Sequence, residues 1–258
     1  MYNFDLEMPS SVAEAVTALA DEDVQALAGG QTLIPTLKQR LASPTKLVSL
    51  SGITEMKGVS IADGVLTIGG GATHAEVAAD ACAPVAALAA KIGDPAVRNR
   101  GTIGGSLANN DPSACYPAAM LALGATIVTN VREVAADDFF QGMFTTALDE
   151  GEIITSVRCT IPESANYQKF EQPASRFALV GVFVAKFSDG VRVAVTGASE
   201  DGVFRWSAAE DALSANFSSD AVPVAPNADG MIADLHGTSA YRAHLVAVMT
   251  KRAVAACG

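Results

Sequence analysis

The sequence predicts an α+β fold built from three consecutive parts, at about residues 1–56, 57–164 and 165–258. In the first part, short apolar runs alternate with stretches of helical periodicity, which indicates a small α/β unit. The middle part combines strand-like runs with an alanine-rich helical stretch, and the last part has two long β-branched runs before a final helix. A chain of 258 residues, 50% of them hydrophobic, is long enough to bury a core.

The first part is predicted to be a small β-α-β-α-β unit. Ser11 and Glu14 have the spacing of a capping box, and apolar residues at helical spacing follow, which predicts a helix over 10–20. The elements expected after it are a short buried strand, a helix that begins after two glycines, and another strand, at residues 24–28, 31–42 and 46–50.

The middle part begins with two strand-like runs joined by an Asp-Gly turn. Thr73 and Glu76 have the spacing of a second capping box, at the start of a helical stretch over 74–91 that we expect to break near Pro84. The other elements expected here are a helix from Pro112 to about Leu123, and strands and a turn within residues 125–129, 132–140 and 152–162.

The last part is predicted to start with a β-hairpin. Two apolar runs, at 177–187 and 191–199, are joined by a Ser-Asp-Gly turn. After it we expect a short helix at 207–213, a polar loop at 216–233, and a helix at 238–256 with Tyr241, Leu245, Val248, Met249 and Arg252 on one stripe.

The charge balance excludes one class of partner. With 17 basic and 28 acidic residues, the chain has a net charge of −11 and repels phosphate backbones, so no nucleic acid partner is expected. No run approaches the roughly 18 apolar residues of a membrane helix, so no membrane span is expected. The N-terminus lacks a basic segment followed by an apolar stretch, and we therefore expect a cytoplasmic protein with reduced thiols.

Two glycine motifs are the candidate ligand-binding segments. In "ALAGGQT" (26–32) a strand ends, two glycines let the backbone turn, and a helix begins, so that backbone N–H groups can face an anion. "GTIGGSLANN" (101–110) is a second glycine turn, with short polar side chains that suit a polyhydroxylated ligand carrying a pyrophosphate. Neither motif has the spacing of a Rossmann or a Walker loop. A plain turn, or a polar surface loop, is the alternative for each motif.

No side chains suggest chemistry of their own. The sequence has no GxSxG or HExxH motif, and its three histidines are too far apart to suggest a metal cluster; they are expected to cap, to hydrogen-bond or to face solvent. The four cysteines have no CxxC spacing, so neither a zinc nor an iron–sulfur site is expected in this chain. A glycine-lined site without an acid/base pair indicates that a bound cofactor carries the chemistry.

Several stretches resemble the FAD-binding medium subunit of the xanthine dehydrogenase (molybdenum hydroxylase) family: "LAGGQTLIPTLKQRL", "THAEV", "GDPAVRNRGTIGGSLANNDPSACYPA" and "YQKFEQPASRFALVGV". "VRVAVTGASEDGVFR" and "DLHGTSAYRAHLVAVMTKRAV" resemble the C-terminal domain of that family. The resemblance runs nearly end to end and is closest to the carbon monoxide dehydrogenase members. It implies a vanillyl-alcohol-oxidase-like (PCMH-type) fold, in which two α/β subdomains hold FAD between them and a C-terminal α+β domain covers the flavin.

The resemblance also implies which residues hold FAD. The two glycine motifs would clasp the pyrophosphate and the ribityl chain through backbone N–H groups, without a cation. Ile92 matches an apolar position close to the flavin, and Ile154 an aliphatic residue packed on the isoalloxazine ring. Lys169 matches a lysine near the polar edge of the ring, where a cation favours the anionic reduced flavin. The clasp residues are Leu27, Ala28, Gly29, Gly30, Gln31, Thr32 and Leu33 in the first motif, and Thr102, Ile103, Gly104, Gly105 and Ser106 in the second, with Asn109 and Asp111 nearby.

Cys115 is a departure from the family pattern. Relatives often have at this position an acidic residue that lines the FAD site, and its role does not carry over to a thiol. Taken alone, Cys115 is expected to be a small buried residue. We expect FAD binding to survive on the backbone clasps, and the tuning of the flavin or its reactivity with oxidants to differ.

The resemblance implies an electron-transfer subunit that turns over no organic substrate alone. A large partner subunit would hold the molybdenum cofactor and hydroxylate the substrate, a small partner subunit would carry two [2Fe-2S] clusters, and FAD in this chain would pass electrons to an external acceptor. The complex is expected to be a dimer of heterotrimers, with contact to the inner face of the membrane left open. Two alternatives remain: a free-standing FAD oxidoreductase of the same fold, and a scaffold subunit without flavin.

Overall fold

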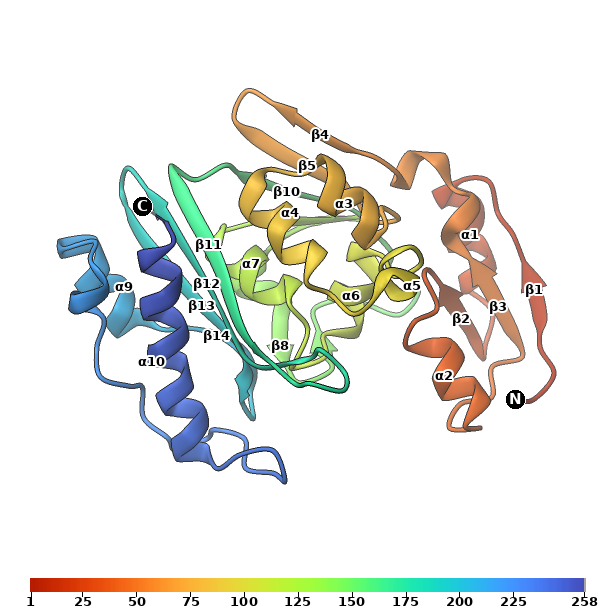
Figure 1. Ribbon diagram of the computed structural model, residues 1–258. Coiled ribbons are helices and arrows are strands. Elements are labelled where there is room, and N and C mark those ends of the chain that lie inside the picture. Colours follow the sequence, from red (N-terminus) through yellow and green to blue (C-terminus); the bar gives the residue numbers. More distant parts are fainter. Residues whose placement is uncertain (258) are drawn as a thin grey trace.

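The computed structural model describes residues 1–257. Its elements form three units, with the N-terminal unit at one end of the molecule and the C-terminal unit at the other (Figure 1). The strand orders of their sheets are β1-β3-β2, β4-β5-β10-β6-β7 and β11-β12-β13-β14, and the hairpin β8-β9 adds a small sheet to the middle unit. The α+β class predicted from the sequence is therefore confirmed.

The N-terminal unit is a parallel sheet with two helices, as the alternating pattern predicted. Helix α1 begins where the Ser11 hydroxyl accepts a hydrogen bond from the N–H of Glu14, at 3.2 Å. The Glu14 carboxylate accepts from the N–H of Ser10, at 2.7 Å, so the reciprocal bond forms one residue earlier than a capping box requires. The unit comprises β1 (Asp5–Glu7), α1 (Val12–Leu19), β2 (Val24–Leu27), α2 (Leu33–Lys38) and β3 (Lys46–Ser49).

Strand β2 is not buried, contrary to the prediction. Its central residues Gln25 and Ala26 are exposed, because β2 lies at the edge of the sheet, with β3 as its neighbour. An apolar run does not reveal whether its strand is central or at an edge. The edge position leaves Gln25 and Ala26 in the wall of the cavity described below.

The middle unit is an antiparallel sheet whose lower face, in the view of Figure 1, is covered by helices α3, α4, α6 and α7. Helix α3 begins with the predicted capping box: the Thr73 hydroxyl accepts from the N–H of Glu76, and the Glu76 carboxylate accepts from the N–H of Thr73. The helical stretch breaks before Pro84, as predicted. The unit comprises β4 (Val59–Ala62), β5 (Val65–Gly69), α3 (His74–Asp80), α4 (Ala83–Ala90), α5 (Pro95–Arg98), α6 (Ile103–Asn109), α7 (Tyr116–Ala122), β6 (Thr126–Thr129), β7 (Glu133–Ala135), α8 (Ala136–Phe139), β8 (Phe140–Gly142), β9 (Thr145–Thr146) and β10 (Ile154–Thr160), and the 3-10 turns Leu50–Gly52 and Thr54–Met56 lead into it.

The prediction was wrong for the segment between α4 and β6. Helix α6 occupies most of the glycine turn expected at 101–110, the short helix α5 precedes it, and α7 begins at Tyr116 instead of Pro112. Pro117 occupies the first turn of α7. Helix α6 starts at the N-cap Thr102, whose hydroxyl accepts from the N–H of Gly105 at 3.1 Å. Because glycine is a poor helix former, propensity alone could not reveal α6.

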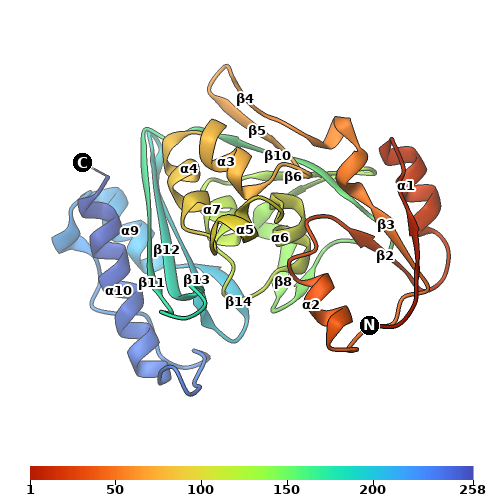
Figure 2. The same ribbon diagram turned by 45° about the vertical axis from the view of Figure 1, so that its right-hand side comes forward.

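The sheet of the C-terminal unit is buried on both faces, which explains its continuous apolar strands. Strands β12 and β13 form the predicted hairpin, with Phe183 opposite Ala194. Phe183 belongs to the core that contains helix α7, whereas Val182 and Val184 belong to the core that contains α9 and α10. The sheet therefore separates the middle unit from the two C-terminal helices (Figure 2). The unit comprises β11 (Ser164–Glu171), β12 (Ala178–Phe187), β13 (Gly190–Ser199), β14 (Gly202–Arg205), α9 (Ser207–Ala215), the 3-10 turn Ser219–Ala221 and α10 (Ser239–Ala255).

Two further differences from the prediction concern the buried side of α10 and the segment 132–140. Tyr241 and Arg252 are exposed, whereas Arg242 and Val246 are buried, so the buried stripe lies one residue from the predicted one. Arg242 can be buried because its guanidinium donates to two backbone carbonyls and to a carboxylate. The segment 132–140 contains the one-turn helix α8 between two short strands.

Candidate cofactor site

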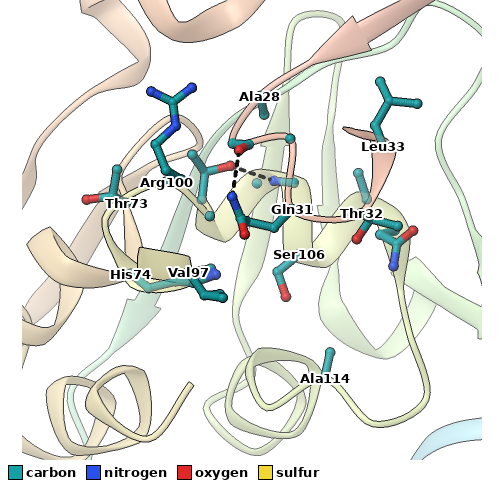
Figure 3. Close-up of a pocket in the computed structure, with 18 of the residues that line it drawn as sticks. Ala28, Gln31, Thr32, Leu33, Thr73, His74, Val97, Arg100, Ser106 and Ala114 are labelled. Carbon is teal, nitrogen blue, oxygen red and sulfur yellow. Dashed lines mark hydrogen bonds between the residues drawn. The ribbon is translucent and has the colours of Figure 1, made fainter. Parts of the chain in front are cut away.

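A cavity of about 950 Å³ lies between the N-terminal and middle units, and its far end reaches the β11–β12 connection. Most of its wall comes from within residues 25–36, 70–76, 92–115, 152–154 and 169–177, and the remaining lining residues are Ala42, Leu50, Ser51, Met56 and Lys57. The volume lies near the upper end of the roughly 300–1,000 Å³ range of small-molecule sites, as an extended dinucleotide requires. Figure 3 shows how the first glycine motif faces the start of α6 in this cavity.

The structure brings together nearly all of the residues that the sequence singled out. Leu27 and Ile103 are the exceptions: Ile103 is fully buried in the core of the middle unit, and Leu27 packs beneath Gly30. The predicted residues that line the cavity are Ala28, Gly29, Gly30, Gln31, Thr32, Leu33, Ile92, Thr102, Gly104, Gly105, Ser106, Asn109, Asp111, Ile154 and Lys169.

The first glycine motif offers free hydrogen-bond donors. Gly30 has a φ of 72°, a left-handed conformation that lets the chain turn from β2 into α2. In the described part of the chain, the N–H groups of residues 29–33 have no acceptor. Gln31 donates from its side chain to the Gly29 carbonyl at 3.3 Å, which stiffens the turn (Figure 3). Consecutive free N–H groups on a cavity wall are suited to a phosphate or a pyrophosphate.

The second glycine motif does not offer a run of such donors, contrary to the expectation from the sequence: of its N–H groups, only that of Thr102 lacks an acceptor in the described residues. The N–H of Gly104 donates to the Gly70 carbonyl at 2.9 Å, and that of Gly105 to the Thr102 hydroxyl. The N–H groups of Ile103 and Ser106 also have acceptors within the protein. The glycines at 104 and 105 serve close packing instead of freeing donors, so this motif can contribute side-chain groups and shape.

Glycines allow four backbone segments to approach each other closely beneath the cavity. A Cβ on Gly29 would collide with the carbonyl of Arg100, and one on Gly104 would lie 2.6 Å from the carbonyl oxygen of Gly70. A Cβ on Gly70 would in turn collide with the carbonyl of Ile154. The segments that carry these glycines come from different sheets and loops, so the cavity depends on contacts that only glycine permits.

Lys169 marks the far end of the cavity. Its ammonium donates to the carbonyls of Lys91 and Arg176, both at 2.7 Å, and lies 3.8 Å from the sulfur of Cys115. No carboxylate of residues 1–257 forms an ion pair with it. Burial raises the pKa of the Cys115 thiol, which the Lys169 ammonium only partly offsets, so the thiol is neutral and the positive charge remains uncompensated.

Glu152, a carboxylate that also lines the cavity, fixes the start of β10. Glu152 accepts two hydrogen bonds from the Arg132 guanidinium, at 3.1 and 2.9 Å, and one from the Thr129 hydroxyl at 2.6 Å. The Arg132 guanidinium lowers the pKa of Glu152 to about 2. The side chain of Ile154 is therefore held in the wall by a charged network directly before it in the chain.

His74, which sequence reasoning did not assign to the site, also lines the cavity. It is the first residue of α3, is 5% exposed, and its ring packs on that of Tyr116 at a centroid distance of 5.3 Å. Burial, with a smaller contribution from the Arg98 charge, lowers its pKa to about 4. The imidazole is therefore neutral at physiological pH.

This shift predicts a pH dependence of stability. Unfolded histidine titrates near 6.5 and His74 near 4, so the unfolded state binds the extra proton between these values. The contribution of the neutral His74 to stability is fully present above pH 6.5, and the loss of this contribution lowers the free energy of unfolding by about 3 kcal/mol as the pH decreases to 4. Urea unfolding of the FAD-free chain at pH 7.5 and pH 4.5 measures this loss. The loss is expected to shrink in His74→Gln; an unchanged loss would contradict the assignment.

Other lining residues were missed, and the sequence contained a signal for some of them only. Residues 69–71 are three consecutive glycines, and Gly70 and Gly71 line the cavity. A glycine run after a strand indicates close backbone approach. Arg176 and Phe177 line the far end, but nothing in their local sequence distinguishes them.

Within residues 1–257 no helix is long and apolar enough to cross the bilayer, and no three His, Cys, Asp or Glu side chains gather as a metal site. Residues 2–164, which form most of the cavity, match the sequence profile described as the FAD-binding domain in molybdopterin dehydrogenase. The chain belongs to this family of FAD-binding subunits. The family resemblance inferred from the glycine motifs is thus confirmed.

Similar proteins extend the likeness over nearly the whole subunit. The carbon monoxide dehydrogenase medium chain of Afipia carboxidovorans is 32% identical and aligns with 98% of this chain and 96% of its own. The nicotine 6-hydroxylase medium subunit of Paenarthrobacter nicotinovorans is 33% identical, over 97% and 95% of the two chains. The crystal structure of quinoline 2-oxidoreductase from Pseudomonas putida 86 matches with a TM-score of 0.89 at 30% identity, covering 99% of this chain and 97% of the other.

The site fits FAD on its own geometry. The free donors of residues 29–33 suit a pyrophosphate, the volume suits a dinucleotide, and Ile92 and Ile154 supply apolar walls toward the end that carries Lys169. These roles remain predictions for the individual residues.

Proposed function

We propose that this FAD-binding subunit transfers electrons within a heteromeric molybdenum hydroxylase, from [2Fe-2S] clusters of a small partner subunit through FAD to an external acceptor. A large partner subunit with the molybdenum cofactor would hydroxylate the substrate, and the assembly would be a dimer of heterotrimers. The observation that carries the proposal is the cavity itself, because it joins free backbone donors to an apolar end with one uncompensated ammonium.

The residues of the chain would bind and orient FAD, which supplies the reversible electron carrier when it is bound. The N–H groups of residues 29–33 would hold the pyrophosphate without a cation. Ile92 and Ile154 would pack on the ring system and exclude water. Lys169, held by two carbonyls, would place a fixed positive charge at that end and favour negative charge on the reduced cofactor.

The substrate would be chosen by the large partner subunit. Relatives that cover nearly the whole chain are named for carbon monoxide, nicotine and glyceraldehyde, at 30–33% identity. One FAD-binding scaffold thus accompanies different substrates. A carbon monoxide dehydrogenase-like role is therefore a proposal for the complex as a whole.

The proposal predicts different behaviour for the lone chain and for the complex. The lone chain is expected to bind one FAD, visible as bands near ~450 nm, and to oxidise neither carbon monoxide nor an organic substrate. With its large and small partners, addition of the substrate is expected to bleach these bands. Substrate turnover by the lone chain would instead establish a free-standing oxidoreductase, and a colourless protein after incubation with FAD would establish a scaffold.

A further inference from the structure

Two neighbouring aromatic side chains bury polar atoms that have no hydrogen-bond partner within residues 1–257. These are Nδ1 of His74 and the hydroxyl of Tyr116, in rings that lie 5.3 Å apart. His74 is 5% exposed and Tyr116 is 0% exposed. An unsatisfied buried polar group destabilises the folded state, so each of them requires an explanation.

The two residues differ in their relation to the cavity. His74 lines it, next to Val97 (Figure 3), whereas Tyr116 is fully buried and is not among the lining residues. The backbone N–H of His74 donates to the Gly101 carbonyl at 2.9 Å, and the imidazole packs so closely on Gly101 that a Cβ there would lie only 2.5 Å from Nε2. Glycine at position 101 therefore leaves room for this imidazole edge beside the second glycine motif.

We propose that His74 is a further cofactor-contacting residue, whose imidazole N–H donates a hydrogen bond to an oxygen atom of FAD. This inference rests on the proposed function, since it requires FAD in this cavity. Nδ1 is enclosed by protein atoms, so the ring nitrogen left for a ligand at the cavity wall is Nε2, whose N–H would donate while Nδ1 stays the unsatisfied buried acceptor. The neutral state of the imidazole, caused by its burial and by Arg98, means that one ring nitrogen donates and the other accepts.

The proposal predicts opposite effects of one substitution on stability and on binding. In His74→Leu, an apolar side chain replaces the unsatisfied imidazole, so we expect the FAD-free chain to melt about 2–4 °C higher. Its Kd for FAD is expected to rise about tenfold, because the contact is lost. His74→Gln, which retains an amide donor, is expected to stay within about threefold of the original Kd.

Tyr116→Phe is the matched control. It removes the neighbouring unsatisfied atom behind the cavity wall, so it is expected to raise the melting temperature without changing the Kd for FAD. FMN and ADP serve as half-ligands in the same titrations of the full chain. Weaker binding of FMN by His74→Leu places the contact on the flavin half, weaker binding of ADP places it on the adenylate half, and both outcomes support the proposal.

The failure of this inference can be told apart from the failure of the proposed function. If the unmodified chain does not bind FAD, the proposed function is wrong. If it binds FAD and His74→Leu binds FAD, FMN and ADP equally well, His74 does not contact the cofactor. If His74→Leu loses both affinity and melting temperature and His74→Gln restores neither, His74 is a packing residue and the inference is overturned.

Discussion

Gly104→Val is expected to weaken FAD binding by about 100-fold or more, because it forces apart two segments of the cavity floor. The first atom of the new side chain would lie 2.6 Å from the carbonyl oxygen of Gly70, which accepts the hydrogen bond of the Gly104 N–H. Helix α6 must then move away from the loop after β5, and the second glycine motif moves with it. Equilibrium titration of the FAD-free chain with FAD measures the loss.

The effect arises from contact between two backbone segments and not from collision with the cofactor, so the loss of FAD affinity should increase with the size of the side chain at position 104. Gly104→Ala is expected to lose less affinity than Gly104→Val. Gly58→Val is the control. Gly58 has a φ of 91°, and an added Cβ would meet no atom within 4 Å. This variant therefore introduces backbone strain without a close contact. Circular dichroism verifies that each variant folds. Full flavin occupancy in Gly104→Val would rule out this account of the cavity floor.

Cys115→Asp is expected to leave FAD bound, or bound more tightly, and to lower its midpoint potential by roughly 30–60 mV. The carboxylate would lie beside the Lys169 ammonium, which is 3.8 Å from the present sulfur and has no ion-pair partner in the described residues. The ammonium holds the new carboxyl ionised, and the pair no longer provides a net positive charge. Reduction of FAD adds negative charge, which this end of the cavity would then stabilise less.

The matched control is Cys115→Ser, which keeps the size of the side chain and adds no charge. Spectroelectrochemical titration of the FAD-loaded chain compares the variants. The Ser variant is expected to keep the original potential within error. Equal potentials for the Asp and Ser variants would show that Lys169 does not act on the flavin through its charge.

Local chemistry in the sequence determined a substantial part of the fold. The capping box at Thr73 and Glu76 and the break before Pro84 depend on residues within a few positions of each other, and both are present. The hairpin of β12 and β13 is likewise set by two β-branched runs and one short turn. The edge position of β2 and the buried side of α10 depend on which element packs against them, so the sequence could not reveal them.

The same division holds for the site. The sequence by itself determined the family and the two glycine motifs, because these are runs of residues whose spacing is visible in the chain. Only the tertiary structure decided that the first motif has a run of free N–H donors and the second does not, since the acceptor for Gly104 is Gly70, on a different segment. It also decided that Lys169 meets Lys91 and Cys115, which lie 78 and 54 residues away in the chain, and that Nδ1 of His74 has no partner in the described residues. The physical reason is that hydrogen-bond satisfaction and burial belong to groups brought together by folding, and not to neighbours in the sequence.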